Sequence, residues 1–164
     1  MGNSLLDSIN DIFVISTSGI PLYGKCFGGE ICSKKPDHLL QSGFIVAMFS
    51  FAKEFGQKSI IFVEFENGRM VFSARKLENA ELLTVFFTTN EHSIEDIKEM
   101  VTKSADLFVT NYGTKVVQAN NLFNTKDYEG FTSDLLDSGF MNRKPMGNIA
   151  TLFKPSKKKR FLFF

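Results

Sequence analysis

The stretch Gly19–Lys25 is the part of the sequence closest to a catalytic or ligand-binding motif. Its glycines and lysine match the G-x-x-x-x-G-K core of phosphate-binding loops, in which backbone N–H groups surround phosphate oxygens. However, Cys26 stands where such loops have a Mg²⁺-binding serine or threonine, and the bulky Leu22 occupies a position that must wrap around phosphate. Gly28-Gly29 follows instead of a helix, so no helix N-terminus would face a ligand. The sequence favours a β-hairpin here, and we expect no cofactor.

The histidines and cysteines lack the spacing of a metal site or a catalytic centre. His38 and His92 each stand near an expected helix start, and neither has a cysteine or second histidine at ligand spacing. Cys26 and Cys32 are too few for a disulfide framework, and no signal-peptide pattern precedes them, which favours a reducing, cytoplasmic location. The sequence also has no nucleophile-elbow motif. We therefore expect no metal site, no catalytic residues and no enzymatic activity.

Residues 141–164 hold the most prominent binding candidate. They contain seven lysines and arginines and no acid, which leaves 12 basic against 18 acidic residues in 1–140. A basic segment beside an acidic domain favours an anionic partner or docking on its own domain. Cations next to phenylalanines suit an anionic lipid surface, whereas the acidic domain disfavours nucleic acid. The candidate contact residues for lipid or another anionic partner are Lys154, Lys157, Lys158, Lys159, Arg160 and Phe161.

Length and composition predict a single globular domain. The chain has 164 residues, 43% of them apolar, 19 phenylalanines and a net charge of +1. This is enough to build an independent core. No segment offers 18 apolar residues free of charge, so we expect no membrane span. We place the domain at residues 1–140 and expect a flexible tail over 141–164, which has two prolines and no helical periodicity.

Turn and capping residues divide the domain into short strands and three helices. Ser18-Gly19 and Asn67-Gly68 predict hairpin turns, Ser93 begins a helix, and Gly56 and Gly113 are expected helix ends. In the helix after Gly113, Phe123, Phe131, Leu135 and Phe140 are the expected buried positions. Strands are expected at 11–17, 20–27, 59–66, 69–76 and 81–89, and helices at 37–56, 93–113 and 115–140, the last broken near Gly130.

The first helix is apolar on two opposite faces. One face has Leu40, Phe44, Ala47, Phe51 and Phe55 at helical spacing. If this face covers the sheet, Ile45, Val46 and Phe49 would be exposed on a monomer. Exposed apolar patches mark interfaces, so these three residues are the candidate protein interface. The alternative is that the tail or residues 28–36 cover them.

Three segments resemble the longin domain, within the broader group that includes roadblock domains. They are IFVISTSGIPLYGK (12–25), LLQSGFIVAMFSFAKEFG (39–56) and ELLTVFFTTN (81–90), and the resemblance spans about residues 9–140. It implies an α+β fold with ββαβββαα order and a five-stranded, antiparallel-type sheet. The first helix would cover one face of that sheet and the last two helices the other. Profilin-like and ligand-sensing sheet domains share this general shape.

The resemblance also implies a function without catalysis. Longin-type domains pair through the first helix and an edge strand, and the pairs serve as platforms for small GTPases, adaptors or vesicle-fusion partners. The expectation is a stand-alone cytoplasmic or membrane-peripheral domain that forms a homo- or heterodimer with a longin or roadblock domain. Residues 141–164 have no coiled-coil heptads and no membrane anchor, which favours a scaffold subunit over a protein that drives vesicle fusion. An archaeal source is compatible with the composition. Alternatives are binding of anionic lipid, or of a small molecule inside the Phe-rich core.

Overall fold

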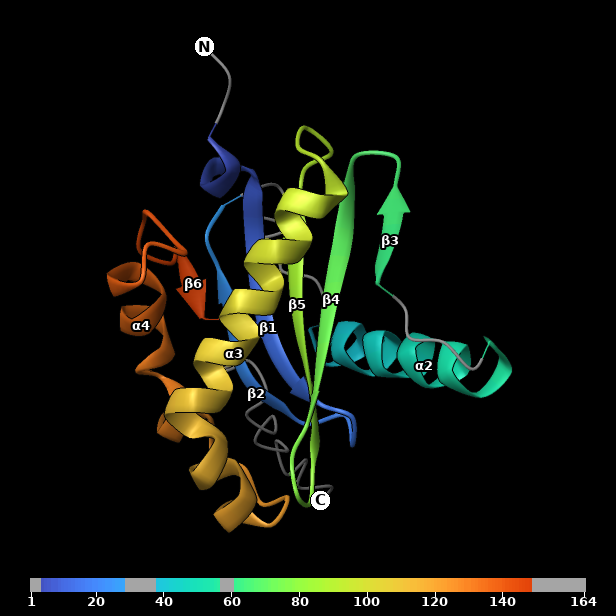
Figure 1. The fold of residues 1–164 in the computed structure, drawn as a ribbon, viewed down its shortest axis with the longest axis vertical. Coiled ribbons are helices and arrows are strands. Elements are labelled where there is room, and N and C mark those ends of the chain that lie inside the picture. Colours follow the sequence, from blue (N-terminus) through green and yellow to red (C-terminus); the bar gives the residue numbers. More distant parts are fainter. Residues whose placement is uncertain (1–3, 29–37, 57–60, 149–164) are drawn as a thin grey trace, which may run out of the picture.

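The computed structural model describes residues 4–28, 38–56 and 61–148 (Figure 1). They form an α+β fold around one antiparallel sheet of strand order β3-β4-β5-β1-β2-β6, in which β6 has only two residues. The expected α+β class and the antiparallel sheet are therefore confirmed. The strands are β1 (Ile9–Ser16), β2 (Pro21–Cys26), β3 (Phe62–Phe65), β4 (Gly68–Lys76), β5 (Glu81–Thr88) and β6 (Gly147–Asn148). The helices are α2 (His38–Gly56), α3 (Ile94–Ala119) and α4 (Phe131–Asp137), with 3-10 turns η1 (Leu5–Ser8) and η2 (Thr125–Tyr128).

The two expected hairpins are confirmed. Gly19 turns the chain between β1 and β2 with a φ of +92°, which a residue with a side chain rarely adopts. Lys25 lies within β2, and its ammonium group forms a 2.8 Å ion pair with Glu129. In the second hairpin the turn residues are Glu66 and Asn67, one position earlier than expected. Gly68 already belongs to β4, where it pairs with Phe65. A Cβ at this position would lie 2.9 Å from a backbone oxygen of β5, which favours glycine.

Side chains that alternate along the strands build two hydrophobic clusters on opposite sides of the sheet. In β1, Ile12 and Val14 belong to the larger cluster, which α3 and α4 complete with Phe108 and Phe131. The intervening Phe13 belongs to the smaller cluster, to which α2 contributes. Figure 1 shows α3 passing in front of the sheet and α2 behind it. The sheet is thus covered on both sides, more extensively on the α3 side.

The C-terminal helices differ from the expectation. Helix α3 does not end at Gly113 but continues to Ala119, and Asn120 ends it in the left-handed conformation, with φ 47°. Gly113 lies inside α3, where a Cβ would meet Val109 at 3.4 Å and Leu77 at 4.0 Å, which are ordinary contact distances. The expected helix over 115–140 is therefore wrong, since α4 has only seven residues.

Of the four side chains expected to be buried within residues 115–140, two are fully buried. Phe131 and Leu135 on α4 are fully buried, whereas Phe123 and Phe140 are only partly buried against the same cluster.

Residues 141–148 pack against the domain, although the sequence placed them in the tail. Met141 is buried, and β6 pairs with the end of β2. The guanidinium group of Arg143 donates to the backbone oxygens of Phe27 at 2.8 Å and Leu6 at 2.9 Å, and also to that of Ile9. One side chain therefore connects η1, β1 and the end of β2. Residues 149–164 lie outside the described residues.

We expect Arg143→Ala to destabilise the domain by about 2 kcal/mol, because three backbone oxygens lose a charged donor. Urea unfolding of the intact chain measures the change, with the neighbouring, exposed Lys144→Ala as the control. Equal unfolding midpoints for the two variants would show that Arg143 does not hold this corner together.

The sequence also predicted reduced cysteines and no membrane-spanning segment. Cys26 is disulfide-bonded, which differs from the expected reduced thiols, and Cys32 lies outside the described residues. Among the residues that the structure describes, none of the helices is long and apolar enough to cross a membrane.

Candidate interaction surface

The three residues predicted to form an exposed interface on α2 face the sheet instead. Ile45 is 1% exposed and Phe49 is 2% exposed, and both belong to the smaller cluster. Val46 is half-buried and packs against the same cluster. The expectation that these side chains are exposed on a monomer is therefore wrong. Both faces of α2 are apolar, so spacing alone did not show which of them packs against the sheet.

The outward side of α2 is aromatic. Phe44 is 53% exposed, Phe51 is 64% exposed and Phe55 is 77% exposed. The rings of Phe51 and Phe55, one helical turn apart, stack with their centroids at 4.6 Å. These phenylalanines were expected to cover the sheet, yet they present a continuous apolar strip to solvent. Such a strip is unusual on a monomer and indicates a docking site.

Strand β3 lies at one edge of the sheet and also exposes apolar side chains. It is the outermost strand beside β4, and among the described residues no strand pairs with its other side. Phe62 is 43% exposed and Phe65 is 47% exposed, on opposite faces of the strand. An unpaired edge with apolar side chains readily accepts another strand. We call Phe44, Phe51 and Phe55 together with the outer edge of β3 the aromatic surface.

An ion pair fixes one side of α2 to the sheet. The Lys53 ammonium group lies 3.1 Å from the Glu81 carboxylate of β5 and 5.8 Å from the centre of the Phe49 ring. The neighbouring Glu54 is exposed. Between α2 and the end of β1 lies a pocket of about 280 Å³, lined by Thr17, Phe49, Ser50, Lys53, Glu54 and Glu81.

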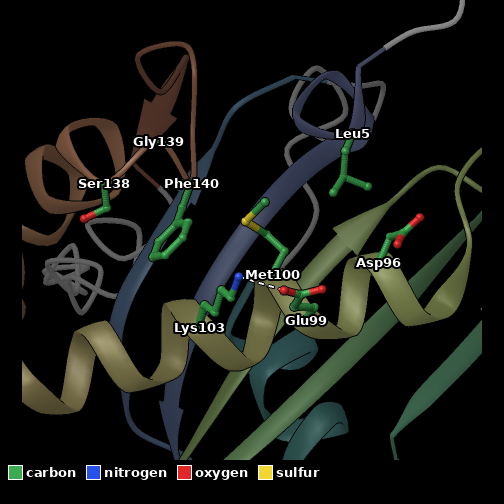
Figure 2. A pocket seen from close by; sticks show the side chains of 8 residues that line it. All are labelled: Leu5, Asp96, Glu99, Met100, Lys103, Ser138, Gly139 and Phe140. Carbon is green, nitrogen blue, oxygen red and sulfur yellow. Dashed lines mark ion pairs between the residues drawn. The ribbon is translucent and has the colours of Figure 1, made fainter.

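A second pocket, of about 310 Å³, lies on the opposite side of the sheet between η1, α3 and the end of α4 (Figure 2). Leu5, Met100 and Phe140 give it an apolar lining. On the α3 side, Glu99 and Lys103 form a 2.7 Å ion pair, and both side chains are more than half exposed. An exposed pair one helical turn apart is a common surface feature of helices. This pocket suits an apolar group but has no buried acid–base pair.

Among the described residues, Asp11 is a carboxyl group buried beside the smaller cluster. It is 2% exposed in β1, opposite Cys26 on one side and Phe87 on the other. Burial raises the pKa of Asp11 to about 7. Removing the charged form from water is the physical cause. The alternating pattern of β1 gave no signal for this residue, because a single acid in a strand usually faces solvent.

Both histidines lie in the described part of the chain. His38 is the first residue of α2, and the backbone oxygen of His92 accepts a 2.6 Å hydrogen bond from Arg69. No group of three or more His, Cys, Asp or Glu residues in the described ranges could hold a metal ion.

The expected contact residues for lipid or another anionic partner lie outside the described residues. They are Lys154, Lys157, Lys158, Lys159, Arg160 and Phe161. The fold and its surface thus define an α+β, antiparallel-sheet domain with an exposed aromatic surface on one helix and one sheet edge. The chain matches no protein-family model and no curated protein.

Proposed function

We propose that this chain is a non-catalytic interaction domain of the longin type that pairs through its aromatic surface. One observation carries the proposal: the exposed rings of Phe44, Phe51 and Phe55 lie on the helix that precedes β3, whose outer edge pairs with no strand among the described residues. A second domain that covers this region removes apolar rings from water and supplies hydrogen-bond partners to the edge of β3. The candidate partners are a second copy of this chain or another longin or roadblock domain.

The magnitude of burial supports pairing. Covering a phenylalanine contributes roughly 1.5–3 kcal/mol, so three rings together offset a large part of the cost of association. The pairing of two edge strands adds backbone hydrogen bonds that a helix surface alone does not provide. The sequence had favoured Ile45 and Phe49 as interface residues. The interface proposed here uses the opposite side of α2.

The resemblance extends this proposal to a role. A longin-type pair would present its remaining surface as a platform for a small GTPase or for trafficking proteins at a membrane. The order of the elements supports the resemblance, since two strands precede α2 and three more lie between α2 and α3. The short α4 and the added β6 are features that the resemblance did not imply.

The experiment is an affinity capture of the intact chain from a lysate of its own source, with and without a GTP analogue, analysed by mass spectrometry. The chain with Phe55→Asp is the control bait, because this substitution places a charge on the aromatic surface without altering the hydrophobic core. Recovery of a longin or roadblock domain, or a nucleotide-dependent GTPase, by the native chain but not by the variant supports the proposal. Equal recovery by both baits would contradict docking on the aromatic surface. Recovery of neither a longin or roadblock domain nor a GTPase would contradict the proposed role as a platform.

A further inference from the structure

We propose that the pocket between η1, α3 and the end of α4 docks a segment of another protein in which a large apolar side chain stands next to a lysine or arginine. The pocket lies on the opposite side of the sheet from α2 and shares no residue with the aromatic surface. The proposal therefore goes beyond the pairing proposed above and does not rest on it.

Three partly buried side chains from three separate elements form the apolar floor of the pocket. Leu5 comes from η1, Met100 from α3 and Phe140 from the segment after α4, and each packs against the outside of the larger cluster. In Figure 2, Met100 lies between Phe140 at one end of the pocket and Leu5 at the other. An incoming apolar side chain would remove this floor from water, and the unbranched Met100 adapts to its shape.

The end of α4 fixes the position of Phe140. The Gly139 N–H donates to the Leu136 oxygen at 3.2 Å, and the Phe140 N–H donates to the Leu135 oxygen at 2.9 Å. This is the hydrogen-bond pattern of a Schellman motif, in which the residue after a left-handed glycine packs back on the helix. Gly139 has a φ of +73°, which a residue with a side chain rarely adopts. Local backbone chemistry thus positions the aromatic end of the pocket.

The wall formed by η1 is also held in place. Ser4 and Asp7 form a capping box, with the Ser4 N–H donating to the Asp7 carboxylate at 3.1 Å and the Asp7 N–H donating to the Ser4 hydroxyl at 3.3 Å. The same carboxylate accepts a 3.2 Å hydrogen bond from the Asn142 amide, two residues after Phe140. The two walls are therefore joined to each other. A floor built in this way does not have to be ordered when a partner docks.

The openness of the pocket favours a protein segment over a small molecule. Its volume of about 310 Å³ is at the lower end of the roughly 300–1,000 Å³ typical of small-molecule sites. The side chains of Glu99 and Lys103 at its rim are 64% and 56% exposed. A small molecule would keep much of its surface in water here. The side chain of a docked segment would not, because the rest of that segment covers the rim.

The charges at the rim favour a cation beside the apolar side chain. Glu99 and Lys103 form a 2.7 Å ion pair and neutralise each other. Asp96 lines the same end of the pocket as Leu5 in Figure 2, and its carboxylate forms no ion pair within the described ranges. The rim therefore has one net negative charge. It attracts a lysine or arginine of the partner and repels an acid at the same position.

The test titrates the intact chain, labelled with ¹³C at its methionine methyl groups, with two acetylated peptide amides, Gly-Phe-Lys-Gly and Gly-Phe-Glu-Gly. The Met100 methyl signal, assigned with Met100→Leu, should shift with the lysine peptide at about millimolar concentration, as expected for a single apolar anchor. The glutamate peptide should bind several-fold more weakly. Asp96→Asn should weaken binding of the lysine peptide about two- to fivefold. Glu95→Gln is the matched control, because Glu95 is an exposed neighbour that does not line the pocket, and it should preserve the native preference.

A second variant separates the apolar floor from the charge. Phe140→Ala, with its fold checked by circular dichroism, should weaken both peptides by the same factor. Equal binding of the two peptides to the native chain, an unchanged preference in Asp96→Asn, or no shift of the Met100 methyl would each overturn the proposal. Phe55→Asp alters only the aromatic surface and should bind both peptides as the native chain does. Failure of this docking site is therefore distinguishable from failure of the pairing.

Discussion

Phe49→Asp is expected to unfold the domain. The Phe49 side chain is 2% exposed and lies in the cluster that joins α2 to the sheet. Truncating a buried phenylalanine costs about 3–5 kcal/mol, and an unpaired carboxylate in an apolar cluster adds to that loss. The total approaches the whole stability of an ordinary domain. Thermal and urea unfolding followed by circular dichroism measure the effect.

The matched control is Phe55→Asp, one to two helical turns away on the outer side. Phe55 is 77% exposed, so this change should alter the free energy of unfolding by no more than about 0.5 kcal/mol. A native-like melt for Phe49→Asp, combined with destabilisation by Phe55→Asp, would mean that α2 packs with its other side on the sheet.

Asp11→Asn is expected to stabilise the protein at pH 8 and to flatten its pH dependence. The folded state keeps Asp11 protonated up to a pKa of about 7, whereas the unfolded chain loses that proton near its ordinary value of 3.8. Between these pH values the folded state binds more protons than the unfolded state. The stability contributed by Asp11 therefore falls as the pH rises through this window and levels off above about 7.

The expected size of this effect is up to about 4 kcal/mol between pH 4 and pH 8. Urea unfolding at several pH values compares the native chain with Asp11→Asn, which resembles the protonated acid. Asp137→Asn, an exposed acid on α4, is the control and should follow the native curve. Parallel curves for the native chain and Asp11→Asn would show that Asp11 ionises freely in the fold.

Local signals in the sequence predicted the parts of the fold that depend on local chemistry. The Asn67-Gly68 pair marked the β3–β4 hairpin, and the Ser93 hydroxyl accepts a hydrogen bond from the Asp96 N–H at the start of α3. The same reasoning failed at Gly113, because a single glycine weakens a helix by only about 1 kcal/mol and does not have to end it. It also gave no sign of the Arg143 contacts, since the fold brings those backbone oxygens together from η1, β1 and β2.

The polar residues of α2 carried a signal for its orientation that the spacing of its apolar residues did not. At 100° per residue, Glu54 lies directly opposite Ile45, and Ser50 lies near the same side. The pair Ser50 and Glu54 marks the outward side better than Lys53, whose long side chain reaches back to Glu81. Phe51 and Phe55 flank the outward side and are exposed.

The proposed function requires that a partner docks on the aromatic surface. Sedimentation equilibrium of the intact chain, alone and with any partner recovered by capture, tests it against the double variant Phe51→Ser, Phe55→Ser. We predict that the native chain associates and that the variant keeps its native melt but binds at least about 100-fold more weakly, since two buried rings contribute roughly 3 kcal/mol or more. Equal association by the variant, or a native chain that stays monomeric and has no partner, would contradict the claim.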